Sequence, residues 1–248
     1  MLQLIRENLK SCYLYFTSPE YREALRVKRT CRNMPPRKSF TINIADYTVL
    51  VHDCESLHHQ YESIFTDEVY AFTSEKTDPL IYCCGANMGL ELLYWKKHYP
   101  QCRIVAFEAD ENIFKVLQQN VSVNELSEVT LHNVAVWTTN GQVSFEADGQ
   151  QGGKAGSGQL KINAIALHEQ LAAAGKIDFL LIDIEGAELA VLQSCRTQLP
   201  NVKRLFVEWH SAASQPQQLP ELLTLLTECG FRYRLQNKLP RAPFNNPV

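Results

Sequence analysis

The stretch LIYCCGANMGLELLYWKKH, residues 80–98, joins a short apolar run to a helix-like segment through a turn that contains glycine. Gly85 and Gly89, on either side of Asn87, allow a tight turn and a close approach of the backbone to a ligand. The first amides of the following helix would point at a ligand carboxylate or phosphate. Turns between strands and helices also need glycine for structural reasons, so this turn alone is weak evidence for a cofactor site.

From about residue 79 onward, short apolar runs alternate with amphipathic segments, which predicts strands that alternate with helices. The predicted strands span residues 80–84, 103–108, 129–134, 179–184 and 203–209. This alternation favours a parallel sheet with helices on both faces. Ligands of such sheets bind at the carboxyl ends of the strands, so functional residues are expected just after each strand.

Residues 1–70 carry no cofactor motif and are predicted to form an N-terminal cap of helix and strand, ahead of a domain at residues 71–248. Within the cap, TINIADYTVLVHD (41–53) alternates apolar and polar residues around an Ala-Asp turn, which predicts a strand pair or a bent strand. The segment CESLHHQYESIFTDEVYAF (54–72) has apolar residues at helical spacing and is predicted to be a helix.

Composition limits the class of protein. The chain has 248 residues, 45% of them hydrophobic and 21% charged, which suits one substantial core. A net charge of −3 and a pI near 6.2 give no reason to expect a nucleic-acid or membrane partner. No apolar run approaches the roughly 18 residues of a membrane span. The eight cysteines include no CxxC pair, so a reduced, cytoplasmic protein is expected.

The segment EADGQQGGKAGSGQLK (146–161) interrupts the alternation of strands and helices. It contains five glycines and almost no large apolar residue, so it cannot contribute to a core. The segment is therefore predicted to be a surface loop, either a disordered insertion or a lid that becomes ordered over a substrate.

Glu108 ends the predicted strand that follows the glycine turn, in RIVAFE. An acid at that place can hydrogen-bond the two ribose hydroxyls of an adenosine-type cofactor. Dinucleotide-binding enzymes normally carry GxGxxG, and the spacing Gly85-Ala-Asn-Met-Gly89 lacks its third glycine. The spacing therefore favours S-adenosylmethionine, with a nicotinamide-dependent oxidoreductase as the alternative.

The segment IDFLLIDIEGAELAVL (177–192) places three carboxylates at the end of a buried strand. Asp183 lies at the strand tip, Glu185 at the turn, and Glu188 in the first turn of the next helix. Carboxylates gathered in this way usually face a polar ligand, water or a cation. Capping of the helix can account for Glu188 and Glu185, whereas Asp183 is predicted to be functional.

The next predicted strand, VKRLFVEWH (202–210), carries Glu208 and His210 toward the same edge of the sheet. Residues two apart on a strand share a face, so these side chains can converge on the space beyond Asp183. His210 is a candidate general base near neutral pH, and Glu208 can orient it or bind a hydroxyl. The alternative is that His210 is only a surface residue at the end of a strand.

Together these segments resemble the FkbM family of S-adenosylmethionine-dependent methyltransferases. The resemblance rests on CCGANMGLE, RIVAFEADENIFKVLQQNVSVN, VTLHNVAVW, IDFLLIDIEGAELAVL, LFVEWH and LLTECGF, with YESIFTDEVYAF ahead of them, and covers roughly residues 60–232. It implies an α/β class I methyltransferase fold, Rossmann-like, with a mostly parallel seven-stranded sheet and helices on both faces. The implied reaction is usually O-methylation of a hydroxyl on a sugar or natural product.

The resemblance also implies roles for single residues. The glycine turn lines the methionine end of the cofactor, Glu108 holds the ribose, and Ala109 with residues 133–135 surrounds the adenine. The implied cofactor-binding residues are Cys83, Gly85, Asn87, Gly89, Glu108, Ala109, Asn133, Ala135 and Asp183, and the implied substrate-binding residues are Glu185, Glu208 and His210.

The chain departs from the family pattern at two positions. The family turn commonly reads D-x-G-A-N-x-G, and Cys83 replaces the aspartate that helps to hold the cofactor's ammonium group. His168, in IALHEQL, stands where relatives tend to carry an LD pair. Cys83 therefore keeps open the alternative of a non-catalytic, ligand-binding member of the same fold.

The expected reaction is a direct displacement, in which the protein aligns an acceptor oxygen with the methyl-sulfur bond and excludes water. His210 is the first candidate for the catalytic base and Asp183 the second. Asp183, Glu185 and Glu208 could bind Mg²⁺, but a metal is not expected and no residue is assigned to one. The expected partner is a small-molecule hydroxyl acceptor, with no nucleic acid and no membrane.

Overall fold

The computed structural model describes residues 13–35, 38–146, 154–156, 158–211 and 216–236. Its main sheet has five parallel strands in the order β11-β10-β3-β4-β5. These strands are β3 (Leu80–Cys84), β4 (Arg103–Phe107), β5 (Val129–His132), β10 (Phe179–Ile182) and β11 (Leu205–Val207). All five predicted strands are confirmed, although four of them end one or two residues earlier than predicted. Asp183 and Glu108 are consequently the first residues beyond their strands.

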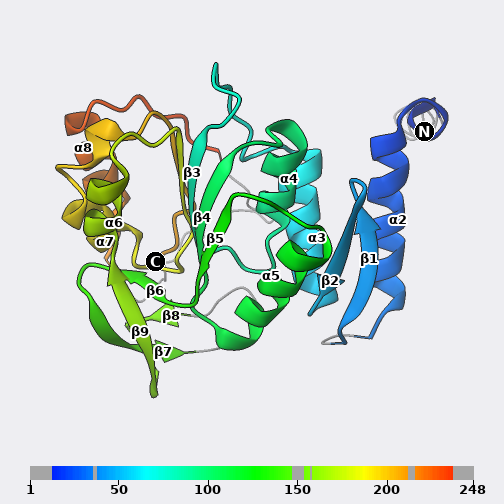
Figure 1. Cartoon of the computed structure of the whole chain (residues 1–248), viewed down its shortest axis with the longest axis horizontal. Coiled ribbons are helices and arrows are strands. Elements are labelled where there is room, and N and C mark those ends of the chain that lie inside the picture. The colour runs from blue at the N-terminus through cyan, green and yellow to red at the C-terminus, as the bar shows by residue number, and fades with distance from the viewer. Residues whose placement is uncertain (1–12, 36–37, 147–153, 157, 212–215, 237–248) are drawn as a thin grey trace, which may run out of the picture.

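Helices cover both faces of this sheet (Figure 1), as predicted. One face carries α4 (Leu90–His98) and α5 (Glu111–Val123). The other carries α6 (Leu167–Ala174), α7 (Glu188–Ser194) and α8 (Leu219–Glu228), with a short 3-10 turn, η2 (Leu199–Asn201), after α7.

Alternate residues of β3 belong to two different apolar cores. Ile81 and Cys83 pack in the core on the α4 and α5 side, whereas Tyr82 and Cys84 pack in the core on the α6 to α8 side. This follows from the twofold side-chain period of a strand. A strand buried on both faces must be apolar throughout, which explains why the sequence of β3 reads as a continuous apolar run.

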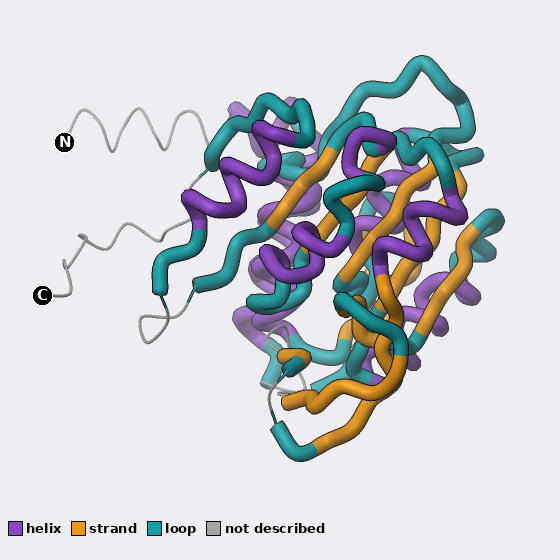
Figure 2. The backbone as a smooth tube through the Cα atoms, turned by 90° about the vertical axis from the view of Figure 1, so that its left-hand side faces the viewer, coloured by secondary structure: helices purple, strands orange, loops and turns teal. Residues whose placement is uncertain are grey.

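A second sheet contains β6 (Ala135–Trp137), β7 (Gly141–Glu146), β8 (Lys154–Ala155) and β9 (Leu160–Ala166), in the order β6-β9-β7-β8. It lies below the main sheet in both Figure 1 and Figure 2. The seven-stranded sheet implied by the resemblance is therefore not found in the described residues, where the main sheet has five strands. The chain leaves the main sheet after His132, and β6 pairs with β9 instead.

The loop within the glycine-rich segment 146–161 is shorter than predicted. Residues 147–153 and 157, which hold most of its glycines, lie outside the described residues. At its ends, however, β7 extends to Glu146 and β9 begins at Leu160, and β8 lies within it. Residues 154–155 pair with β7, and the amide of Gly156 donates to the Ser144 carbonyl at 2.7 Å.

The N-terminal elements pack beside α4 and α5 (Figure 1). They are α2 (Pro19–Asn33), β1 (Phe40–Ile44), β2 (Tyr47–Val51), α3 (Cys54–Tyr61) and a π-helical turn, η1 (Glu62–Thr66). The predicted strand pair is confirmed as an antiparallel hairpin. Its turn residues Ala45 and Asp46 have positive φ values of 49° and 72°, as a tight hairpin turn requires.

Asn120 of α5 and Asn124, the C-cap of the same helix, join the hairpin to the rest of the chain. The amides of Leu50 and Thr48 donate to the side chains of Asn120 and Asn124 at 2.7 and 2.8 Å. The side-chain amide of Asn120 donates in turn to the carbonyls of Leu50 and Met88. Backbone groups at the open edge of β2 thereby have hydrogen-bond partners, and Asn120 connects the hairpin to the glycine turn at Met88. Within the described residues, no helix is both long and apolar enough to cross a membrane.

Candidate active site

A cavity of about 310 Å³ opens at the carboxyl ends of β3, β4 and β10. The strand order reverses between β3 and β10, so the cavity lies where open α/β sheets bind their ligands. Nine of the predicted site residues line it: Gly85, Asn87, Glu108, Ala109, Ala135, Asp183, Glu185, Glu208 and His210. The convergence of these side chains was expected, because the carboxyl ends of neighbouring parallel strands meet at one edge.

The glycine turn lies tightly against two strands. Gly85 has a φ of +91°, and a Cβ atom there would collide with the carbonyl oxygen of Asp183. The amides of Gly85 and Ala86 both donate to the carbonyl of Phe107, at 3.0 and 2.9 Å. Only glycine fits at position 85, because both the backbone angle and the contact with β10 exclude a side chain.

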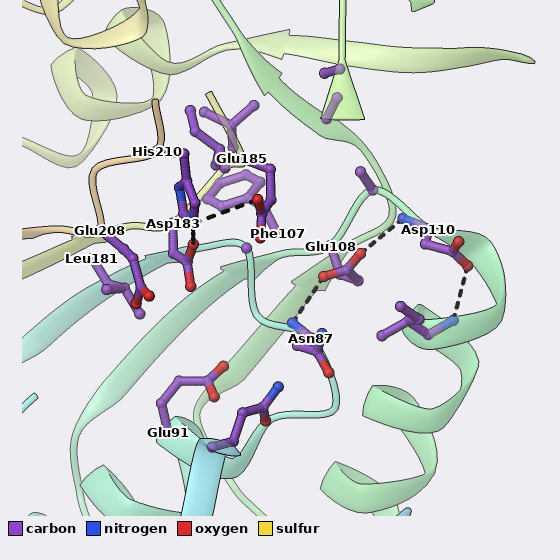
Figure 3. A pocket seen from close by; sticks show the side chains of 18 of the residues that line it. Asn87, Glu91, Phe107, Glu108, Asp110, Leu181, Asp183, Glu185, Glu208 and His210 are labelled. Carbon is purple, nitrogen blue, oxygen red and sulfur yellow. Dashed lines mark hydrogen bonds and ion pairs between the residues drawn. The ribbon is translucent and has the colours of Figure 1, made fainter. Parts of the chain in front are cut away.

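Glu108 connects the glycine turn to the start of α5 (Figure 3). Its two carboxylate oxygens accept from the amides of Asn87 and Asp110, each at 2.8 Å. Burial raises the pKa of Glu108 to about 7, and these backbone hydrogen bonds oppose the shift. Each oxygen keeps a second lone pair, so the carboxylate can still accept from two hydroxyls of a ligand.

Three predicted cofactor residues do not line the cavity. Cys83 is completely buried within the core next to α4. Gly89 caps α4, and a Cβ atom there would press on Leu117, so this glycine serves helix packing. Asn133 donates its side-chain amide to the carbonyls of Glu108 and Ala109, at 2.9 and 3.3 Å, and holds the wall of the cavity from behind.

His168 also lies away from the cavity lining. Its Nε2 atom lies 3.9 Å from Oε1 of Glu169. Nothing in the structure explains why His168 replaces the residue found in relatives.

His210 lies among three carboxylates. Its Nδ1 atom is 2.9 Å from Oε1 of Glu188, and its Nε2 atom is 3.5 Å from Glu185 and 3.8 Å from Asp183. Figure 3 shows the ring next to Asp183 and Glu185 on the cavity side. Glu188 was predicted to cap α7, and its Oε1 does accept from the amide of Gly186 at 2.9 Å, but the same atom also holds His210.

These contacts change the protonation of the pair formed by His210 and Asp183. Burial lowers the pKa of His210, but the hydrogen bond to Glu188 and the charges of Asp183 and Glu185 outweigh it and raise the pKa to about 9. Burial and the charge of Glu208 raise the pKa of Asp183 well above its ordinary range, against the effect of His210. In the protein without ligand, His210 is therefore protonated at neutral pH and is not the free base that its ordinary pKa would make it.

A cation could bind at the same place. Asp183, Glu185 and His210 each offer a ligand atom, and these atoms lie within 4.8 Å of one another. The set differs from the predicted one, because His210 takes the place of Glu208. A protonated His210 supplies one positive charge beside these two acids, so it competes with a cation for the same carboxylates.

Several lining residues were not predicted from the sequence. Glu91, in the first turn of α4, is only 3% exposed and faces the cavity. Tyr70 and Gln60 also line the cavity, and Oε1 of Gln60 is a buried acceptor without a hydrogen-bond partner among the described residues. Burial and the nearby Asp183 raise the pKa of Tyr70. The apolar spacing of residues 54–72 predicted a helix here but did not indicate which side chains reach the cavity.

The cavity is strongly acidic. Six carboxyl side chains line it: Glu91, Glu108, Asp110, Asp183, Glu185 and Glu208. The described lining residues include two histidines but no lysine and no arginine. Such a surface attracts a ligand that carries positive charge and repels one with several negative charges.

Comparison with known proteins agrees with this geometry. The family described as "Methyltransferase FkbM domain" matches residues 84–233, more than half of the chain. Methyltransferase sdnD of Sordaria araneosa is 27% identical over 212 residues, which cover 69% of this chain and 80% of that protein. The 2-O-methyltransferase NoeI of Sinorhizobium fredii is 23% identical over 192 residues, which cover 68% and 77%.

Among solved structures, Methyltransferase FkbM from Methylobacillus flagellatus KT aligns with a TM-score of 0.45 and 19% identity. The alignment covers 63% of this chain and 39% of that chain. The family match and the parallel sheet with its cavity at the strand ends lead to one conclusion: the chain belongs to the FkbM methyltransferase family.

Proposed function

We propose that this protein is an S-adenosylmethionine-dependent O-methyltransferase that methylates a hydroxyl of an uncharged small molecule. The observation that carries the proposal is the acidic cavity at the strand ends, which has Glu108, held by two backbone amides, at one end and a histidine among carboxylates at the other. Family membership supports methyl transfer as the reaction. The charge of the site supports the choice of cofactor and of acceptor.

The charge of the cavity favours S-adenosylmethionine over a nicotinamide dinucleotide. S-adenosylmethionine carries a sulfonium and an ammonium group against one carboxylate, so its net charge is positive. A dinucleotide carries a pyrophosphate, which needs unpaired backbone amides or basic side chains. The amides of Gly85, Ala86 and Asn87 already donate within the protein, and the described lining includes no lysine or arginine.

The adenosine end of the cofactor fits the part of the cavity around Glu108. The Glu108 carboxylate is held in place by two backbone amides and can accept from the ribose hydroxyls. Apolar walls beside it come from Phe107, Ala109 and the segment 134–136, which suit a flat aromatic base. The glycine turn allows the chain of the ligand to pass close to the backbone at Gly85.

When bound, the cofactor supplies a methyl group already activated by the positive sulfur. The residues of this chain then have to orient the acceptor, exclude water and remove one proton. His210 is held by Glu188 and directs Nε2 toward Asp183 and Glu185. A cationic ligand beside these groups lowers the pKa of His210 and Asp183, so that one of the two can accept the hydroxyl proton as the oxygen-carbon bond forms.

The acceptor side favours a neutral molecule with several hydroxyls. Asp183, Glu185 and Glu208 can each accept hydrogen bonds from hydroxyl groups, and an acceptor with carboxylates or phosphates would be repelled by them. One similar protein is named a 2-O-methyltransferase, which supports oxygen as the methylated atom.

The first test is cofactor binding by calorimetry. S-adenosylhomocysteine is expected to bind in a one-to-one complex, whereas NAD gives no heat at the same concentration. Saturable NAD binding would support the oxidoreductase alternative. Absence of binding by both S-adenosylmethionine and S-adenosylhomocysteine at roughly millimolar concentration would reject the proposal and favour a non-catalytic ligand-binding protein.

The second test is transfer of labelled methyl from S-adenosylmethionine to two matched panels of acceptors. One panel contains neutral sugars and polyols, and the other contains the corresponding uronic acids or phosphates. Transfer to the neutral panel alone is expected. Transfer only to the acidic panel would contradict the part of the proposal that concerns the acceptor.

A further inference from the structure

Glu91 is a buried acid at the cavity that neither the family motif nor the sequence pattern singles out. It lies at the second position of α4 and is 3% exposed, yet it lines the cavity. Figure 3 shows its carboxylate directed toward the space between Asn87 and the side chains of Asp183 and Glu208. The thiol of Cys83 donates to its Oε1 atom at 3.5 Å.

We propose that Glu91 binds the ammonium group of the cofactor's methionine part, in place of the acid that position 83 lacks. This inference rests on the proposed use of S-adenosylmethionine. It follows from the contact between the side chains of residues 83 and 91. This contact forms because α4 starts directly after Gly89, so the first turn of α4 lies next to the end of β3. The side chains at positions 83 and 91 therefore meet beside the same corner of the cavity, and in this chain it is Glu91 that lines it.

The simpler explanation for a first-turn acid is stabilisation of the helix dipole, and it does not fit Glu91. An acid in that role is usually exposed, as Glu111 is in the first turn of α5, where its side chain is 72% exposed. Burial instead raises the pKa of Glu91 to about 8, and Asp183 and Glu108 add to the increase. A carboxyl group that is unfavourable in its ionised form when alone, and that faces a cavity, is suited to pair with a cation from a ligand.

The position along the cavity identifies which cation this is. Glu108 occupies the ribose end, and His210 with Asp183 occupies the acceptor end. Glu91 lies across the glycine turn from Glu108, on the wall to which the amino-acid part of the ligand must extend. Gln60 adds a buried acceptor oxygen without a partner among the described residues of the same cavity. An ammonium group has three donors and can satisfy both acceptors.

The test compares two ligands that differ in the amino-acid part. S-adenosylhomocysteine contains the ammonium group, whereas 5′-methylthioadenosine lacks it and keeps the adenosine. In Glu91→Gln, S-adenosylhomocysteine is expected to bind roughly tenfold more weakly or worse, because a charge-assisted hydrogen bond is lost. Binding of 5′-methylthioadenosine should stay within roughly threefold of its value in the unsubstituted protein. Glutamine mimics the protonated acid, so the fold should be retained.

Two further variants complete the experiment. Glu111→Gln changes an exposed acid at the matching place of the next helix and should leave both affinities unchanged. Cys83→Asp added to Glu91→Gln should recover S-adenosylhomocysteine binding, because it returns an acid to the neighbouring position. If the double variant binds S-adenosylhomocysteine as weakly as Glu91→Gln alone, an acid at position 83 cannot replace the acid at position 91, and that part of the inference is overturned.

Unchanged S-adenosylhomocysteine binding in Glu91→Gln would overturn the inference itself. An equal loss for both ligands would also overturn it, because the effect would then concern the whole cavity. Failure of the proposed function is distinct from both results, since it would appear as absence of S-adenosylhomocysteine binding by the unsubstituted protein.

Discussion

His210 and Glu188 form a hydrogen-bonded pair in which Nδ1 lies 2.9 Å from a carboxylate with no exposed surface. The other oxygen of Glu188, Oε2, has no hydrogen-bond partner among the described residues. A buried carboxylate held by one amide and one imidazole retains a strong preference for a charged partner. Glu188 therefore keeps the ring oriented and its proton in place, while Nε2 faces the cavity.

Glu188→Gln should lower the pKa of His210 from about 9 toward its ordinary value of 6.5, because the amide accepts a hydrogen bond but carries no charge. The pKa is measured by following the ring signals of His210 in NMR spectra across the pH range. His168, which lies outside the cavity lining, provides a reference in the same spectra. An unchanged titration of His210 would show that Asp183 and Glu185 alone hold its proton.

His210→Gln should reduce kcat by about 10²- to 10⁴-fold, the usual contribution of a general base. Affinity for S-adenosylhomocysteine should remain similar, because the histidine is placed on the acceptor side. Steady-state kinetics and calorimetry on the same preparation measure both quantities. If kcat falls by less than about threefold in His210→Gln and by a large factor in Asp183→Asn, then Asp183 is the base.

Gly85→Ala should destabilise the protein much more than Gly175→Ala. Both positions have positive φ, +91° and +74°, so alanine is strained at either one. Only at Gly85 does the new methyl group also collide with a backbone carbonyl, that of Asp183, whereas nothing lies within 4 Å at Gly175. Urea unfolding measures the difference in the free energy of unfolding. Equal losses in the two variants would show that β3 and β10 can separate at low cost.

The stability of the protein without ligand should decrease as pH rises from about 4.5 to about 8, and Glu91 should account for part of this change. Its pKa is raised in the folded state, so the folded protein binds more protons than the unfolded chain throughout that range, and each increase in pH favours unfolding. Glu108 and His210 act with the same sign, because their pKa values are also raised on folding.

Urea unfolding of Glu91→Gln at several pH values isolates the share of this residue. The variant should show a weaker dependence on pH than the unsubstituted protein, since glutamine does not titrate. Glu111→Gln is the control, because the side chain of Glu111 is exposed. Parallel curves for Glu91→Gln and the unsubstituted protein would mean that Glu91 is ionised in the folded state across the whole range.

Chelation should leave methyl transfer intact. Asp183, Glu185 and His210 could hold a cation, but a protonated His210 already supplies a positive charge between the two acids. Turnover in excess EDTA is expected to stay within about twofold of the untreated rate. Loss of turnover in EDTA and its return with added Mg²⁺ would assign a metal to this cluster.

Local pattern predicted most of the fold and part of the site. The strands around Glu108 and Asp183 were predicted because apolar runs report burial directly, and the acids that follow them mark the strand ends. Alternation around a turn predicted a strand pair or a bent strand at residues 41–53, and the structure has the strand pair. The pairing of β6 with β9 was not predicted, because the choice between two possible partner strands depends on contacts remote in sequence.

The amino-acid sequence by itself determined that the chain forms a parallel α/β sheet with a glycine turn and carboxylates at the strand ends, because strand period, glycine and the order of elements are local properties. Only the tertiary structure decided which acids act together. Cys83 lies in the core and not in the cavity, whereas Glu91 lines the cavity from a helix. Glu188 is the hydrogen-bond partner of His210. Burial and distance set the charge of each of these groups, and both exist only once the strands and helices have packed.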